Sequence, residues 1–191
     1  MDFSVVPMNI KYAKEMICNW KYDGIYHIYD YKYEEDDLLD ENKWGIEKFA
    51  VLNEKHDLVG ELTIEFLKKK INPDEEGCVV DYDIVKNEPS SKYDMWLGWG
   101  LKPELCGKGF GYKFISECID FSIRKYNYNG EYIKCAVATF NERAFKVYKK
   151  FGFKTFYIKN NGEIANEEVE FYHIQKSIKS IKNGDAQTAN M

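Results

Sequence analysis

The sequence is poor in arginine and histidine and contains no long apolar run. Arginine occurs only at Arg124 and Arg143, and the formal net charge of −5 disfavours a general nucleic-acid binder. The three histidines are scattered and indicate no metal site. No stretch approaches the roughly eighteen consecutive apolar residues of a membrane helix, and residues 1–7 lack the basic segment and apolar run of an export signal. We therefore expect a cytoplasmic protein with no metal, no membrane span and no nucleic-acid partner.

Closely spaced cysteines are missing as well. The five cysteines show no metal-ligand spacing and their number is odd, so free thiols in a reducing compartment are the simplest interpretation. What the chain has instead is 45% hydrophobic and 16% aromatic residues over a length of 191. A chain of that size buries roughly 70% of its unfolded surface. We therefore expect one packed domain over residues 1–181 and a disordered tail over residues 182–191.

Apolar periodicity predicts a mixture of strands and helices. The predicted strands are residues 3–7, 49–52, 58–67, 78–84, 94–101, 132–139, 153–159 and 169–174. Helical spacing of apolar residues follows Asn9, residue 110 and Asn141, and both asparagines are suited to cap a helix. This order of elements predicts a three-layer α/β or α+β fold.

The segments between these elements contain typical turn and loop residues. Gly152 is predicted to end the helix that follows Asn141. Asn161-Gly162 is predicted to form the turn of the last hairpin. Residues 22–41 are expected to be irregular or partly helical, and residues 68–91 to be mainly a loop around a short strand.

Three glycines at alternate positions, Gly107, Gly109 and Gly111, separate a predicted strand from a predicted helix. Glycine lets successive backbone N–H groups turn inward at the positive end of the helix, and such a concavity binds phosphate or pyrophosphate. Between residues 101 and 113, three lysines outnumber one glutamate, so the local charge also favours a polyanion. The loop therefore predicts a phosphorylated cofactor.

Two common phosphate-binding motifs do not fit this loop. A Walker loop requires Gly-Lys followed by Ser or Thr, but Gly107-Lys108 is followed by Gly109. A dinucleotide fingerprint requires G-x-G-x-x-G, but Tyr112 or Phe114 occupies the position of its third glycine. The spacing therefore excludes both motifs.

A second motif lies downstream of the glycines. The two motifs follow each other in the same order, and at the same distance along the chain, as in one known family. The residues that form the two motifs are Leu101, Pro103, Gly109, Gly111, Asn141, Ala144, Tyr148, Gly152 and Phe153. Over residues 96–153 the sequence resembles the GCN5-related N-acetyltransferase superfamily. One position departs from the family pattern, because Cys106 stands where the family usually has Gln or Arg, a side chain that supports the phosphate-binding loop.

The resemblance implies the fold of that family. This fold is a mixed, mostly antiparallel central sheet of six to seven strands flanked by helices, in which two central strands splay apart. The pantetheine arm of acetyl-CoA enters the gap and pairs with backbone like an extra strand. Gly98 and Gly100 are typical of a bulge beside such a gap. We therefore expect residues 1–181 to be an acetyltransferase domain with acetyl-CoA as co-substrate and no metal.

The resemblance also implies the residues of the site. Backbone donors near Trp99 and Leu101 would bind the oxyanion and the pantetheine, and Asn141 would contact the cofactor arm beside them. The expected cofactor-binding residues are Trp99, Leu101, Gly107, Lys108, Gly109, Phe110, Gly111, Tyr112 and Asn141.

Tyr148 and Asp94 are the predicted catalytic residues. By resemblance, Tyr148 would donate to the departing sulfur, and a phenol with a pKa near 10 is protonated at neutral pH, as a donor must be. A lysine-type amine with a pKa near 10.4 is mostly protonated at pH 7 and needs a base. Some family members have a glutamate as base at the position of Ala136, and alanine cannot accept a proton. The candidates are therefore the carboxylates of neighbouring strands, among which we rank Asp94 first, ahead of Glu65 and Glu61.

The predicted function is N-acetyl transfer from acetyl-CoA to a primary amine by direct attack in a ternary complex. The acceptor is expected to be a small molecule or a protein N-terminus. The acidic run at residues 34–41 and the tyrosines before it could attract a cationic amine, although a solvated helix face is the slightly better explanation. A non-catalytic acyl-CoA-binding or sensor module of the same fold is the alternative function. The sequence is compatible with a monomer or a homodimer.

Overall fold

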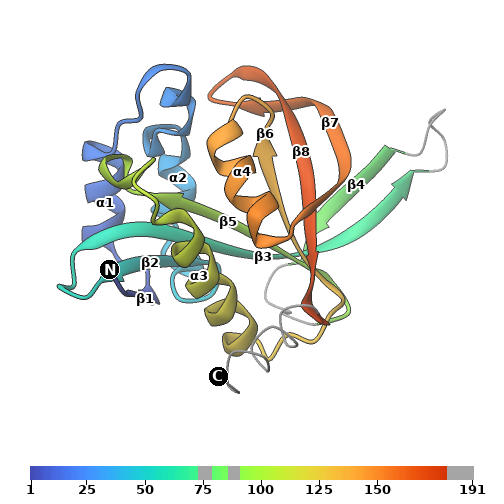
Figure 1. Ribbon diagram of the computed structural model, residues 1–191, viewed down its shortest axis with the longest axis horizontal. Helices are drawn as coiled ribbons and strands as arrows, with labels where there is room; N and C mark the ends of the chain where they lie inside the picture. The colour runs from blue at the N-terminus through green and yellow to red at the C-terminus, as the bar shows by residue number, and fades with distance from the viewer. Residues whose placement is uncertain (73–78, 86–90, 180–191) are drawn as a thin grey trace.

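The computed structural model describes residues 1–72, 79–85 and 91–179, which form one eight-stranded sheet with helices on both faces (Figure 1). The strands are β1 (Phe3–Pro7), β2 (Lys48–Asn53), β3 (Leu58–Asn72), β4 (Val79–Ile84), β5 (Asp94–Leu101), β6 (Tyr132–Ala138), β7 (Lys154–Ile164) and β8 (Glu167–Ser177). The helices are α1 (Ile10–Asn19), α2 (Glu35–Leu38), α3 (Gly111–Lys125) and α4 (Glu142–Phe151), with short 3₁₀ helices η1 (Gly24–Tyr29), η2 (Tyr31–Glu34), η3 (Glu41–Lys43) and η4 (Pro103–Leu105). The tail predicted at residues 182–191 lies outside the described residues.

Each face of the sheet has its own apolar cluster. Alternation along a strand sends neighbouring side chains to opposite faces, so Phe49 and Val51 of β2 join the cluster of α3 and α4, whereas Ala50 and Leu52 join that of α1 and α2. The fold is therefore a helix–sheet–helix sandwich, as the sequence predicts. None of the helices in the described ranges is long and apolar enough to cross a membrane.

The sheet is mixed and mostly antiparallel, in the order β1-β2-β3-β5-β6-β8-β7, which confirms the predicted fold class. β4 makes it one strand larger than the six to seven expected. The first half of β3 pairs with β5, and its second half continues to Asn72 and pairs with β4, forming the arm that projects from the body in Figure 1. The prediction that residues 68–91 are mainly loop is therefore wrong for the end of β3. Part of that segment, residues 73–78 and 86–90, lies outside the described residues.

The central strands β5 and β6 splay apart. They run parallel and pair only through Met95 with Ile133 and Trp96 with Lys134, although β5 continues to Leu101. The predicted bulge is not what separates them, because β5 keeps an unbroken register against β3 through both of its glycines. The glycine at position 100 has another reason, which is that a Cβ built there would lie 2.0 Å from the hydroxyl of Tyr31.

The last hairpin differs from its predicted register. Asn161 and Gly162 lie within β7, and the chain turns instead at Ala165 and Asn166, whose φ angles are 54° and 63°. Gly162 lies at a shift in the β7–β8 register, and a Cβ built on it would be 2.3 Å from the ring of Phe171. The prediction is wrong because a local Asn-Gly pair is weaker than the burial of a whole strand face in fixing register.

The two positions in this hairpin should respond oppositely to substitution. Ala165→Gly should raise the free energy of unfolding by about 0.5–1 kcal/mol, because a non-glycine residue at positive φ is strained. Gly162→Ala should lower it by about 1–3 kcal/mol, because the new methyl group overlaps an aromatic ring. Urea unfolding of each variant measures both values.

Glu163→Gly is the matched control, since it introduces the same residue at an exposed strand position of β7. It should lower stability by about 0.5–1 kcal/mol. If Ala165→Gly and Glu163→Gly lower stability equally, the turn does not lie at residues 165–166.

Candidate active site

The gap between β5 and β6 is lined by backbone groups of β5. The Lys102 N–H donates to the Val59 carbonyl at 2.8 Å, so this pair is hydrogen-bonded across the antiparallel β3–β5 ladder. Such pairs alternate along a ladder, so Trp99 and Leu101 turn their N–H and C=O groups away from β3. On that side β6 pairs no further than Trp96. The structure thus places the backbone of Trp99 and Leu101 at the gap, where the sequence analysis expects it.

The end of β5 is hydrogen-bonded to the N-terminal layer, which is the segment from α1 to η3 that covers one face of the sheet. The Tyr22 hydroxyl donates to the Leu101 carbonyl at 3.0 Å, and the Cys106 thiol approaches the same oxygen at 3.4 Å. Burial raises the pKa of the Cys106 thiol, which opposes formation of a thiolate. This side chain therefore helps to hold the end of β5, and its burial outweighs the opposing effect of the Arg143 charge on the thiol.

Tyr148 lies beside the gap, in α4. Asn141 starts this helix, because its Oδ1 accepts from the Ala144 N–H at 3.2 Å, and Gly152 ends it with a φ of 97°. The Tyr148 hydroxyl accepts a hydrogen bond from the Trp99 indole N–H at 2.7 Å. The two predicted site residues, one on a strand and one on a helix, are therefore in direct contact.

The environment of Tyr148 keeps its phenol protonated. Only 7% of the residue is exposed, and burial raises its pKa well above the ordinary value. Because the indole N–H is a donor only, Tyr148 uses an oxygen lone pair in this contact and its own hydrogen is not consumed by it. The site therefore contains a neutral hydroxyl that can act as a donor.

The glycine loop connects β5 to α3. Gly107 and Gly109 have φ angles of 76° and 86°, which other residues adopt only with strain. Gly111 begins α3 close to α4, where a Cβ would lie 3.5 Å from Val147. Phe110 provides no side-chain cap for α3, so the first N–H groups of the helix need another acceptor. These are the features of a phosphate-binding helix start.

The opposite face of the splayed region has small residues at its centre. Gly98 and Ala136 are exposed although they lie on the internal strands β5 and β6. The β3 residues Thr63 and Glu61 lie beside this surface, opposite Gly98 and Gly100 respectively. A substrate could therefore approach the gap over Gly98 and Ala136, whereas the Tyr31 and Tyr22 hydroxyls lie over Gly100, opposite the buried Glu61.

Glu61 belongs to a buried charge cluster. Its carboxylate accepts from the Thr63 hydroxyl and lies 3.9 Å from the Lys48 ammonium, which in turn lies 2.6 Å from Asp37 of α2. Burial raises the pKa of Glu61 to about 7, while Lys48 and Thr63 oppose the increase. The pKa of Lys48 is raised, because the Glu61 and Asp37 carboxylates outweigh the effect of its burial. Glu61 thus has a pKa suited to exchange a proton near neutral pH.

Asp94, the first-ranked base of the sequence analysis, has a different environment. It begins β5 and forms an ion pair with Lys134 of β6, with 2.6 Å between Oδ2 and Nζ. Its partner lies where β5 and β6 still pair, whereas Trp99 lies in the separated part. The structure therefore does not bring Asp94 together with Trp99 and Tyr148.

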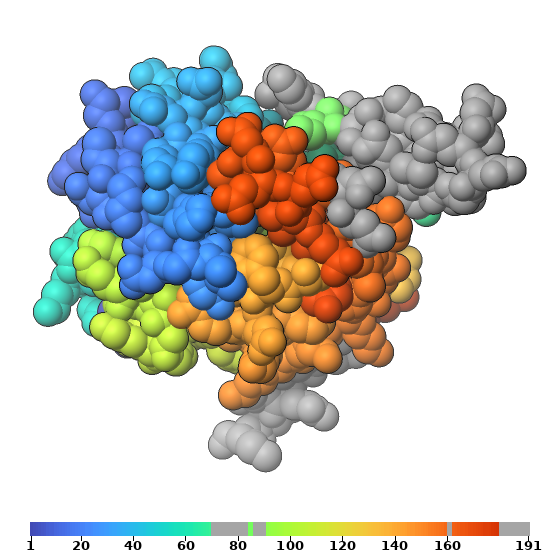
Figure 2. Space-filling model, turned by 90° about the horizontal axis from the view of Figure 1, so that it is seen from above, coloured from blue at the N-terminus to red at the C-terminus, as the bar shows by residue number. Residues whose placement is uncertain are grey.

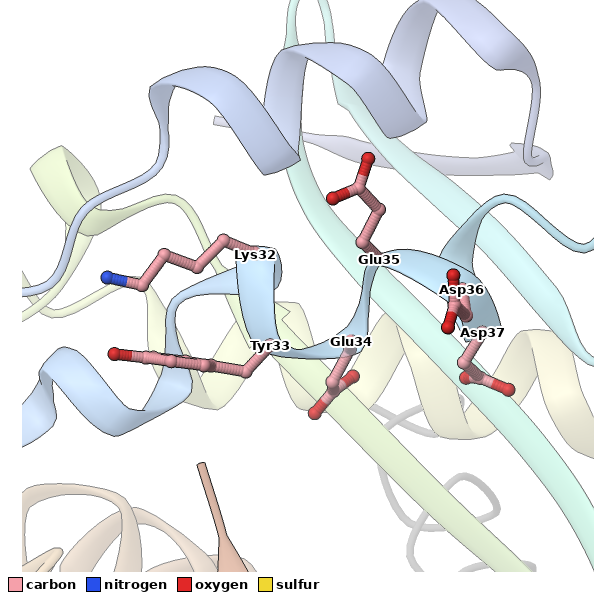
Figure 3. Close-up of a pocket in the computed structure, with 6 residues that line it drawn as sticks. All are labelled: Lys32, Tyr33, Glu34, Glu35, Asp36 and Asp37. Carbon is pink, nitrogen blue, oxygen red and sulfur yellow. The ribbon is translucent and has the colours of Figure 1, made fainter. Parts of the chain in front are cut away.

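Acidic residues of η2 and α2 line an open pocket near Glu61. Figure 3 shows Lys32 and Tyr33 extending side by side, while Glu34 and Glu35 point in opposite directions from the chain. Figure 2 shows that this N-terminal layer reaches the C-terminal hairpin, and Ile28 of η1 packs with Ala138 and Val169 there. The N-terminal layer therefore contacts both β6 and the β7–β8 hairpin beside the splayed strands.

Two features of the candidate site do not follow from the sequence. The side chain of Trp99 received no role, because a contact between a strand and a helix 49 residues away has no local signal. Glu61 was ranked behind Asp94, although strand alternation places it on the same face as Gly98. Among the residues that the structure describes, no three His, Cys, Asp or Glu side chains are grouped as metal ligands.

Comparison with known protein families gives a match. The model of the Acetyltransferase (GNAT) family matches residues 15–153, which is more than half of the chain. No curated protein sequence matches.

Solved structures with the same fold include two acetyltransferases. An acetyltransferase of the GNAT family from Bacillus anthracis has a TM-score of 0.61 and 14% identity, with 93% of this chain and 95% of that chain covered. A spermidine N-acetyltransferase from Vibrio cholerae, solved in complex with CoA and spermine, has a TM-score of 0.59 and 14% identity, with 92% and 95% covered. At identities this low, the structural similarity establishes a common fold alone. Membership of a family rests on the match of the family model. The chain belongs to the GNAT family of acetyltransferases.

Proposed function

We propose that this protein transfers the acetyl group of acetyl-CoA to a primary amine of a small molecule. The observation that carries the proposal is the gap between β5 and β6, with the backbone of Trp99 and Leu101 on one side and the Tyr148 hydroxyl beside it. The net reaction converts an amine and acetyl-CoA into an N-acetyl amine and free CoA. A C–N bond forms and a C–S bond breaks.

The described residues fit acetyl-CoA. The gap accepts an extended arm that pairs with the β5 backbone, and residues 107–112 offer glycine turns and the start of α3 to a diphosphate. Lys108 lies within this loop and adds positive charge. Asn141 caps α4 at the end of β6, from where it would contact the arm. When bound, acetyl-CoA supplies the activated carbonyl carbon and a thiolate leaving group.

Tyr148 is proposed to donate its hydroxyl hydrogen to the departing sulfur. A thiol has an ordinary pKa near 8.5 and a phenol near 10, so complete proton transfer to the thiolate is uphill by about 2 kcal/mol even before burial is considered. Burial raises the pKa of Tyr148 further. Tyr148 therefore acts mainly by hydrogen bonding as negative charge develops on sulfur, and the proton follows from the attacking amine.

A base must accept the proton of the amine. Asp94 stays the prediction of the sequence analysis, but its ion pair with Lys134 and its place at the paired end of β5 favour a structural role. Glu61 lies beside the small-residue surface and has a pKa of about 7. We therefore propose Glu61 as the base, acting directly or through one water.

The acceptor is proposed to be a cationic small amine of the polyamine class. Glu34, Glu35 and Asp36 line the pocket near Glu61, and a structural neighbour of this chain acts on spermidine. A carboxylate-rich surface attracts an amine that carries further positive charges. A protein N-terminus is the second acceptor, and a panel containing both classes distinguishes them.

A non-catalytic acyl-CoA sensor is the second candidate function. It is favoured by one observation, which is that Cys106 replaces the usual Gln or Arg beside the phosphate-binding loop. Release of CoA thiol in the presence of acetyl-CoA and an amine separates the two functions. Release that depends on the amine supports the transferase, whereas tight binding without release supports the sensor.

Substitution in the glycine loop should weaken cofactor binding. Gly109→Ala places a Cβ at a φ of 86° and should raise the Kd for CoA by about tenfold, because a strain of about 1–2 kcal/mol shifts the loop away from its bound conformation. Isothermal titration calorimetry measures this change. Pantetheine, which lacks the diphosphate, is the control ligand, and its affinity should not change. An equal loss for both ligands would place the diphosphate elsewhere.

Removal of the Tyr148 hydroxyl should slow the reaction. Tyr148→Phe should reduce kcat by about 10²–10⁴-fold and leave the Kd for acetyl-CoA within about twofold, because the lost interaction forms mainly in the transition state. Tyr12→Phe, on α1 and packed in the apolar cluster on the other face of the sheet, is the matched control and should keep full activity. Full activity of Tyr148→Phe would remove this residue from the mechanism.

The pH dependence should identify the base. Glu61 must be ionised to accept a proton, and the ionised fraction increases as pH rises through about 7. The value of kcat/KM should therefore rise with pH from about 6 to 8, with a midpoint near 7, and then level off. Glu61→Gln should lose this limb and about 10²-fold in rate.

Asp94→Asn provides the comparison for Glu61→Gln, since both variants exchange a carboxylate for an amide on neighbouring strands. It should keep the acidic limb, and its effect should be on thermal stability through the lost ion pair with Lys134. Loss of the limb in Asp94→Asn alone would assign the base to Asp94. Preserved thermal unfolding of Glu61→Gln would show that its loss of rate is chemical.

A further inference from the structure

The contact between Trp99 and Tyr148 joins β5 to α4. The indole Nε1 lies 2.7 Å from the phenol oxygen, and the ring centroids are 5.8 Å apart. Phe153 lies against both rings, with centroid distances of 6.5 Å to Trp99 and 5.9 Å to Tyr148. The phenol is therefore held by a directional bond as well as by packing.

The direction of this hydrogen bond decides what the phenol can do. An indole N–H donates and cannot accept, so the phenol oxygen is the acceptor. A phenol has one hydrogen of its own, and the bond from Trp99 fixes the oxygen without using that hydrogen. Trp99 therefore has two contacts with the site: its backbone faces the gap, and its side chain holds Tyr148.

Burial makes this contact stronger than it would be in water. Tyr148 is 7% exposed, and the effective dielectric around a buried pair is low. A donor aimed at the phenol oxygen stabilises the partial negative charge that grows there as the hydroxyl hydrogen is shared with an acceptor. The Trp99 hydrogen bond lowers the pKa of Tyr148, in opposition to the larger effect of burial.

We propose that Trp99 is a positioning residue for Tyr148, and that its indole N–H holds the phenol oxygen so that the hydroxyl donates toward the gap between β5 and β6. This inference rests on the proposed function. As the C–S bond breaks, its electron pair goes to sulfur, and the Tyr148 hydrogen is shared with that sulfur. The amine gives one proton to the base, which returns it to solvent, and the thiolate takes up one proton from solvent, so that the protons balance and Tyr148 keeps its own hydrogen.

A double-mutant cycle tests the inference. Trp99→Phe keeps an aromatic ring and removes the N–H, and it should reduce the single-turnover rate of acetyl transfer by about 10–100-fold, with the Kd for acetyl-CoA within about twofold. In the Tyr148→Phe background the same change should reduce the rate by less than about twofold, because the phenol it acts through is absent. An equal loss in both backgrounds, or no loss in either, would overturn the inference.

A second variant removes the donor with less change of shape. Incorporation of β-(3-benzothienyl)alanine at position 99 replaces the N–H by sulfur and keeps the bicyclic ring. It should reproduce the rate loss of Trp99→Phe with unchanged thermal unfolding. A wild-type rate in this variant would show that ring packing is sufficient and would overturn the inference.

Failure of the inference is distinguishable from failure of the proposed function. If the wild-type protein releases no CoA thiol with any amine, the transferase proposal fails. The contact is then tested without activity, by the indole N–H resonance of Trp99 in ¹⁵N-labelled protein, which should shift in Tyr148→Phe. An unchanged resonance would show that the hydrogen bond does not form in solution.

Discussion

The early end of the pairing between β5 and β6 determines the rest of the site. Each of these strands keeps a full partner on its other side, because β3 pairs along all of β5 and β8 pairs along all of β6. The two strands can therefore separate after Trp96 without loss of the outer ladders. Separation leaves main-chain groups of β5 without a strand partner on the β6 side, and although the Leu101 carbonyl accepts from Tyr22, the remaining groups require other hydrogen-bond partners. An extended ligand with amide groups satisfies that requirement as a further strand would.

The helices on one face of the sheet position the glycine loop and Tyr148 beside this gap. α3 begins directly after the glycine loop, and α4 begins directly after β6, with Asn141 at its start and Gly152 at its end. Both helices pack into the same apolar cluster, in which Tyr148 is a member. The position of the phenol is therefore fixed by core packing, and its orientation by the hydrogen bond from Trp99.

The other face carries the charges. Lys48 and Glu61 are both about 4% exposed, and burial of isolated charges on this scale would be strongly unfavourable. Their mutual attraction, the Thr63 hydroxyl and the Asp37 carboxylate compensate for it. Since Asp37 belongs to α2, this cluster anchors the acidic N-terminal layer to the sheet. The surface proposed to receive the amine is thus attached to the strand that carries the proposed base.

The sequence by itself determined the elements that depend on local chemistry. The glycine loop needs positive φ at Gly107 and Gly109, and Asn141 caps α4 through a side chain three residues from its partner. These short-range requirements are visible in residue types and spacing, as are the alternating strands, and together with the family motifs they predicted the mixed sheet and the splayed central strands.

Only the tertiary structure decided which distant residues meet. The contact of Trp99 with Tyr148 and the pairing of Lys48 with Glu61 join residues whose separation along the chain carries no pattern. The turn at Ala165 and Asn166 follows from the register of two whole strands. Asp94 and Glu61 cannot be ranked from residue type, because both are carboxylates on neighbouring strands. Burial separates them, since an acid removed from water changes its affinity for protons, and burial belongs to the packed molecule as a whole.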